Sequence, residues 1–168
     1  MGRFASLLLL LCAGCVPVAL NPFFTPDQWR PAPALLGTWY DEDGDLRWEV
    51  TDVESGSYRI RQTWVGELDA DDLRPPVSLD AHFARFGDRR VLETRLHEIH
   101  NLDATLWAHT IPGFTIAVVG TPADTLRLWW LDDDWLKDRL RAGEVSTPHT
   151  FAGDRLVLSG DTAELQRL

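Results

Sequence analysis

The sequence is short of cysteine and of long apolar runs, and each shortage excludes a class of structure. Only two cysteines, Cys12 and Cys15, occur in 168 residues, and both lie at the start of the chain. A disulfide framework therefore cannot hold the rest of the protein, which must fold by packing alone. The longest leucine run, Leu7–Leu11, is too short to cross a bilayer, because a membrane-spanning helix needs about 20 apolar residues.

Positive charge and catalytic motifs are scarce as well. The chain has 26 acidic residues against 16 Lys and Arg, which gives a net charge of −10. A surface of this sign repels phosphate backbones, so we expect no nucleic-acid binding. No G-x-S-x-G elbow occurs, and no serine stands near a recognisable base. We therefore expect a noncatalytic protein without a cofactor.

The first 15 residues have the layout of a secretory signal, with Arg3, the leucine run and then small residues. The stretch Cys12-Ala13-Gly14-Cys15 resembles the lipobox of bacterial lipoproteins. This resemblance implies a signal peptide over residues 1–14, removed by cleavage, and a diacylglyceryl anchor on Cys15. An ordinary cleaved signal and a buried N-terminal strand are the alternatives.

The lipoprotein resemblance also implies a place in the cell. Acyl chains on Cys15 would hold the protein on a membrane without spanning it. Val16, which follows the cysteine, is not the Asp that retains such lipoproteins in the inner membrane. The expected location is therefore the cell envelope, at the outer membrane and facing the periplasm.

Two further segments follow the signal. Residues 15–33 carry five prolines and little periodicity, which predicts an extended tether. Its aromatic residues, Phe23, Phe24 and Trp29, are too apolar for a fully solvated linker, so we expect part of it to pack on the domain. Residues 34–168 are expected to form a single β-barrel domain.

The domain is predicted from alternating strands and glycine turns. Leu46, Trp48 and Val50 fall on one face of a strand, and Tyr58, Ile60 and Trp64 repeat this pattern in the next segment. Gly-Asp or Ser-Gly turns precede fresh apolar runs, as hairpins require. Further strands are expected at 78–86, 89–97, 114–119, 125–131 and 155–159. The pattern predicts a mainly β protein: one antiparallel meander closed into a barrel of about eight strands.

Two helices are expected beside the strands. Asp132 can cap a helix that ends at Gly143, with acidic residues in its first turn and basic residues in its last. This helix is expected before the last strand. A short C-terminal helix is predicted from the capping-box spacing of Asp161 and Glu164.

The stretch Leu35-Leu36-Gly37-Thr38-Trp39-Tyr40 resembles the Gly-x-Trp signature that opens the first barrel strand of lipocalins. The resemblance implies that Gly37 lets the chain pass close to the barrel floor and that Trp39 plugs it. It also implies a stacking arginine, for which Arg155 and Arg167 are both candidates.

An apolar cavity would follow from the lipocalin resemblance. Eight tryptophans suit either such a cavity or a filled core. The residues expected to line a ligand are Trp39, Trp48, Tyr58 and Trp64.

Neither the histidines nor the acidic turn predicts a metal site. His97 and His100, with His109 beyond, lack the HExxH arrangement and would face opposite sides of a strand. Asp41–Asp45 places its glycine fourth, where a calcium loop needs it sixth, so a hairpin turn is expected.

Two functions lead from the sequence, with an unsupported enzyme third. The first is a membrane-anchored lipoprotein whose lipocalin-like domain binds or carries a small apolar molecule. The alternative is a solid-core scaffold lipoprotein that contacts another protein of the envelope. In both, the partners are the membrane, through the lipid anchor, and either an apolar ligand or an envelope protein.

Overall fold

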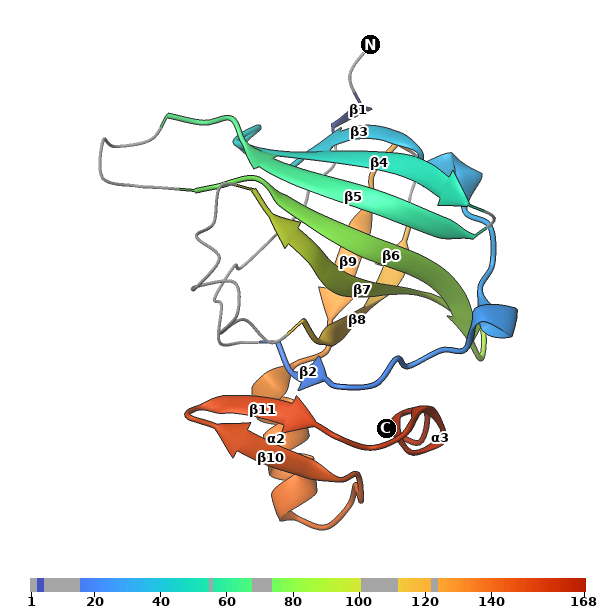
Figure 1. The fold of residues 1–168 in the computed structure, drawn as a ribbon, viewed down its shortest axis with the longest axis vertical. Coiled ribbons are helices and arrows are strands. Elements are labelled where there is room, and N and C mark those ends of the chain that lie inside the picture. Colours follow the sequence, from blue (N-terminus) through green and yellow to red (C-terminus); the bar gives the residue numbers. More distant parts are fainter. Residues whose placement is uncertain (1–2, 5–15, 55, 68–73, 101–111, 122–123) are drawn as a thin grey trace.

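The computed structural model describes residues 3–4, 16–54, 56–67, 74–100, 112–121 and 124–168, which form a mainly β protein with two α-helices and two short 3-10 helices (Figure 1). The strands are β1 (Arg3–Phe4), β2 (Val18–Ala19), β3 (Gly37–Tyr40), β4 (Leu46–Glu54), β5 (Ser57–Trp64), β6 (Val77–Phe86), β7 (Arg89–Ile99), β8 (Phe114–Gly120), β9 (Arg127–Trp130), β10 (His149–Ala152) and β11 (Arg155–Leu158). The helices are η1 (Pro26–Gln28), η2 (Pro33–Leu35), α2 (Asp133–Arg141) and α3 (Thr162–Leu165). In these ranges no helix is long and apolar enough to span a membrane.

The predicted meander is confirmed. Strands β3 to β9 pair antiparallel in sequence order, each with the next. Inward residues of β4 and β5 are buried while their neighbours are more exposed, as the period of two predicts. The connecting turns carry glycines with positive φ at Gly44, Gly56, Gly87 and Gly153.

The expected closed barrel is wrong, because the sheet is open. Its strand order is β1-β3-β4-β5-β6-β7-β8-β2-β11-β10, with β9 paired to β8 off this path. Closure would require backbone pairing between β3 and β9, but β3 pairs with β4 and β1 instead. Side chains fill the space between the two ends of the meander, since Trp39 of β3 and Leu126 beside β9 belong to one buried cluster.

The sheet branches at β8. One edge of this strand pairs with β7, and its other edge is shared between β9 and β2. Strand β2 also pairs in parallel with β11, which forms a hairpin with β10. The predicted helix α2 is present before the last strand, β11, and the unpredicted strand β10 lies between the two.

The N-terminal segment is packed over most of its described length. Val18, Ala19, Phe23 and Phe24 are all buried, and Pro17 is among the fully buried residues. Part of residues 15–33 therefore packs on the domain, as expected. The packed part begins directly after Val16, the first described residue of that segment. Strand β1 lies inside the predicted signal and pairs with β3, so cleavage before Cys15 would remove it.

The two faces of the meander carry separate apolar cores. We call the first the inner cluster, which joins η2 to the concave face: Leu35, Trp39, Leu46, Trp48, Val50, Tyr58, Ile60, Ala81, Phe83, Leu92, Val119 and Leu126. We call the second the outer cluster, in which the chain ends cover the other face: Ala19, Phe23, Phe24, Ala84, Val91, Leu136, Leu156, Leu158 and Leu165. Figure 1 shows the covering elements, α2, α3 and the β10–β11 hairpin, gathered on one side of the meander.

Candidate functional site

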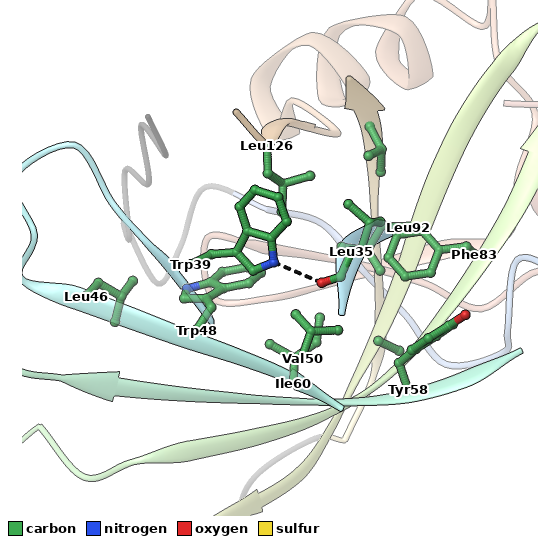
Figure 2. Close-up of a cluster of buried hydrophobic side chains, with 12 residues drawn as sticks. Leu35, Trp39, Leu46, Trp48, Val50, Tyr58, Ile60, Phe83, Leu92 and Leu126 are labelled. Atoms are coloured by element: carbon green, nitrogen blue, oxygen red, sulfur yellow. Dashed lines mark hydrogen bonds between the residues drawn. The ribbon is translucent and has the colours of Figure 1, made fainter. Parts of the chain in front are cut away.

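The residues predicted to line a ligand lie in or against the inner cluster. Trp39, Trp48 and Tyr58 are at most 5% exposed, and Trp64 packs against them while partly buried. Figure 2 shows aliphatic side chains of the same cluster around the rings of Trp39, Trp48 and Tyr58. The sequence therefore grouped these four residues correctly in space, but three of them are packed core residues.

Polar contacts fix two of these rings. Trp39 Nε1 donates to the Leu35 carbonyl at 2.8 Å, the dashed line in Figure 2, and Tyr58 Oη accepts from Ala32 N at 2.7 Å. Gly37 has a φ of +122° and nothing lies within 4 Å of a Cβ built there. Glycine is therefore needed for backbone conformation, and the expected close pass over a barrel floor is wrong.

The stacking arginine implied by the lipocalin resemblance is not at Trp39. Arg155 belongs to β11, which packs with the outer cluster, and Arg167 is exposed near the C-terminus. A different arginine stacks on a tryptophan of the inner side, because the Arg74 guanidinium lies 4.1 Å from the centre of the Trp64 ring. These two residues line a separate surface hollow of about 370 Å³.

The outer face carries the more open apolar site, which we call the outer groove. It has a volume of about 500 Å³ and lies between β6 to β9 on one side and the N-terminal segment, α2 and α3 on the other. Phe86, Trp129 and Trp135 line it and are 49%, 54% and 44% exposed. Aromatic side chains are thus held half in solvent around one concave apolar surface.

Strand β9 places Trp129 in the groove by simple alternation. Trp129 and Trp130 are adjacent, so their side chains leave opposite faces of the strand. Trp130 packs against the inner cluster, which directs Trp129 outward. The ring of Trp129 lies over Gly120 of β8, since a Cβ at that glycine would come within 2.8 Å of Trp129 Cζ3. Gly120 therefore makes room for the ring.

Helix α2 places Trp135. Asp132 caps the helix by accepting from Trp135 N at 2.7 Å, and Leu136, with no exposed surface, anchors the first turn in the outer cluster. Lys137 forms an ion pair with the buried Asp133 and donates to the Asp154 carbonyl at 2.7 Å, which ties the helix to the β10–β11 turn. The hydrogen bond to Asp133 raises the pKa of Lys137 above 10.5.

The C-terminal end of the groove is built by α3. Asp161 and Glu164 form the predicted capping box, and Leu165 is buried. Gln166, the residue directly after α3, donates from Nε2 to the Phe23 carbonyl at 2.7 Å. This hydrogen bond connects the end of the last helix to the N-terminal segment. The two ends of the chain therefore build one wall of the groove together.

A buried carboxylate also holds the N-terminal segment. Glu93, 1% exposed, accepts from Phe23 N at 2.5 Å and Phe24 N at 3.3 Å through Oε2. Its Oε1 has no hydrogen-bond partner but lies 3.6 Å from Nδ1 of His82, which stacks on Trp29 with ring centres 3.7 Å apart. Glu93, His82 and Trp29 line a second hollow of about 390 Å³.

The other predicted positions are distributed as follows. His97 faces Asp80 at 3.3 Å, and His100 contacts Ser78 Oγ at 2.9 Å, so the two rings have different partners. Across the described ranges no three His, Cys, Asp or Glu residues are placed to hold a metal ion. The acidic stretch forms the predicted hairpin turn, in which Asp41 accepts from Leu46 N. Cys15 and His109 lie outside the described residues.

The chain matches no protein-family model, and no curated protein or solved structure matches it either.

Sequence reasoning missed the groove residues Phe86, Trp129 and Trp135. A usable signal existed for Trp129, because two adjacent tryptophans in one strand cannot both face the same core. Phe86 stands directly before the Gly87 turn, where a strand end is often exposed. The groove itself could not be predicted from a local sequence pattern, because segments far apart in the chain form it. Phe23 and Gln166, which meet in its wall, are 143 residues apart.

Proposed function

We propose that this protein is a membrane-anchored lipoprotein whose β domain binds a small apolar molecule, without catalysis, in the outer groove. The observation that carries the proposal is the groove of about 500 Å³ with three half-exposed aromatic side chains around it. Ligand pockets have volumes of about 300–1,000 Å³ and are lined mostly by apolar and aromatic side chains. Exposed apolar patches of this kind mark binding sites.

The site proposed here differs from the one that the sequence favoured. The inner tryptophans support a packed core, because Trp48 is 1% exposed and tightly surrounded. Small barrels and curled sheets are often filled by their own side chains in this way. The outer groove supports ligand binding because the side chains of Trp129 and Trp135 are half exposed, and a bound apolar molecule would cover them.

The proposed lipid anchor suits this arrangement. Cys15 would carry the acyl chains, and β2 begins at Val18, three residues later. Three residues span at most about 10 Å, so an anchored domain would lie against the bilayer. Such a position favours exchange of apolar molecules between the membrane and the groove. The outer membrane, facing the periplasm, stays our proposed location.

A protein-interaction lipoprotein is the second candidate. The packed inner cluster favours it, since a solid core suits a scaffold. In that case the half-exposed Trp129 and Trp135 would contact an envelope protein instead of a small molecule.

Fluorescence of the neutral dye Nile red tests the proposed site. We expect the wild type to bind the dye and Trp129→Ala to weaken binding at least severalfold. Phe151→Ala is the matched control, because Phe151 is 47% exposed but does not line the groove. Gly120→Ala is a second variant, since its new Cβ would push the Trp129 ring aside. Equal binding by all variants, or none by the wild type, would contradict the proposal.

Mass spectrometry tests the anchor and separates the two candidates. Protein purified from its native membrane should lack residues 1–14 and carry acyl mass on Cys15, and Cys15→Ser should abolish both. A native spectrum with a small extra mass, lost on denaturation, favours the carrier. A bound protein subunit in place of that mass favours the scaffold.

A further inference from the structure

The lining of the outer groove has a charged residue at each end and is mostly apolar between them. Arg89 begins β7, and the next residue, Arg90, pairs with Val119, which places Arg89 beside the Gly120 end of β8. Asp132 follows the far end of β9, where Leu131 N donates to the Ile116 carbonyl. The four residue steps from Arg127 to Leu131 rise about 13 Å, so the two charges are well separated.

The guanidinium of Arg89 has no hydrogen-bond or ion-pair partner among the described residues. Its neighbour Arg90 bonds to Thr121, and Arg59, Arg139 and Arg141 all pair with carboxylates. The chain has a net charge of −10, yet within the described ranges no carboxylate pairs with this guanidinium. Arg89 is therefore free to bind an anion at the mouth of the groove.

Asp132 at the other end is already engaged. Its Oδ1 accepts from Trp135 N, and its charge complements the N-terminus of α2. A carboxylate placed there repels an anionic group. The groove thus has one end that attracts an anion and one end that rejects it.

We propose that the groove takes a single-chain amphiphile with an anionic head group, the head at Arg89 and the apolar chain along Trp129 toward Asp132. The inference rests on the proposed function and names its ligand class. Guanidinium groups bind carboxylates and phosphates through charge-assisted hydrogen bonds, and the aromatic lining covers the chain. The single charge fixes the direction in which the chain enters.

Displacement of Nile red by palmitate and by hexadecanol tests this assignment, because the two ligands share a chain and differ in head charge. We expect palmitate to bind about tenfold more tightly than hexadecanol. Arg89→Gln should weaken palmitate binding by a similar factor and leave hexadecanol within about twofold. Arg85→Gln is the matched control, since Arg85 is an exposed arginine of the same hairpin that does not line the groove.

The outcomes separate this inference from the proposed function. Equal binding of both ligands by wild type and Arg89→Gln overturns the anionic ligand class and leaves an apolar-ligand protein. Failure of the wild type to bind dye or either ligand overturns the proposed function itself. Vesicles of phosphatidylglycerol form a third arm. If Arg89→Gln lowers only vesicle binding and not palmitate binding, Arg89 contacts the bilayer surface and the inference is wrong.

Discussion

The inner and outer clusters lie on opposite faces of one sheet, and they are covered in different ways. The inner face curls on itself, so residues of β3 to β5 pack against residues of β6 to β8 of the same sheet and against Leu126. The outer face is covered by β2, α2, α3 and the β10–β11 hairpin, which come from both ends of the chain. A face that curls on itself packs solidly, whereas one covered by several short elements leaves a groove between them.

Polar contacts between distant parts of the chain also hold the outer layer in place. Glu93 holds the backbone of Phe23 and Phe24, Gln166 holds the Phe23 carbonyl, and Lys137 joins α2 to the β10–β11 turn. Short elements bury too little apolar surface to fix their own positions, so directional bonds add what is missing. The comparison predicts a graded series of effects.

Truncation should have the largest effect. Removing residues 1–15 deletes the edge strand β1 and should leave the free energy of unfolding nearly unchanged. Removing residues 1–24 also deletes β2, Phe23 and Phe24, and loss of a buried Phe side chain typically costs about 3–5 kcal/mol. We expect this variant to lose more than about 5 kcal/mol, a large part of an ordinary domain's stability.

Urea unfolding followed by circular dichroism measures the difference between the two truncations. Equal midpoints would mean that residues 16–24 are a dispensable tether. The outer face would then need no cover from the N-terminus, and the comparison between the two clusters would fail.

A pair of tryptophan substitutions compares the two faces directly. Trp48→Ala, in the inner cluster, should lower the free energy of unfolding by about 3–5 kcal/mol. Trp129→Ala, 54% exposed in the groove, should change it by less than about 1 kcal/mol. Chemical denaturation measures both values. A loss at Trp129 as large as that at Trp48 would show that the groove is part of a core and not an open site.

The sequence predicted the local features of both faces but not how they are covered. Alternation and turn glycines predicted strands β4 to β9 and β11 but not β10, and charge placement predicted α2. Barrel closure was predicted wrongly because pairing between the ends of a meander depends on long-range geometry. Strand β2 has only two residues in a proline-rich segment, too few for any periodic signal. The ligand-lining prediction found aromatic residues on a common face and could not distinguish a filled face from a hollow one.

Removing the Glu93 carboxylate should have an intermediate effect. Glu93→Ala leaves the buried N–H groups of Phe23 and Phe24 without an acceptor, which costs about 1–3 kcal/mol. Amide hydrogen exchange should then speed up at these two residues and stay slow at Trp48 and Ile60. Glu98→Ala is the control, because Glu98 lies on the same strand with an exposed side chain. Unchanged exchange at Phe23 would contradict the role of Glu93 as a holding contact.

The smallest effect is expected at Lys137, the only lysine in the chain. Its hydrogen bond to Asp133 raises its pKa above 10.5 in the folded protein. The stabilisation is therefore fully present below pH 10.5 and is lost as the pH rises through the raised value. We expect the melting temperature of the wild type to exceed that of Lys137→Gln by a small constant amount at lower pH. This difference should shrink above pH 10.5.

Thermal melts of both proteins from about pH 8 to about pH 12 measure this difference. Tyrosine ionisation in this range does not alter the difference, because both proteins contain the same tyrosines. Lys137→Arg is the control, since a guanidinium keeps its charge over the whole range. A difference that persists unchanged to the highest pH would mean that Lys137 holds α2 by packing and by its bond to the Asp154 carbonyl, independently of charge. A difference that disappears would instead mean that only the charged Lys137, paired with Asp133 of the same helix, holds α2 to the Asp154 carbonyl of the hairpin turn. The wall of the outer groove would then loosen at alkaline pH while the inner cluster, which has no such pair, stays packed.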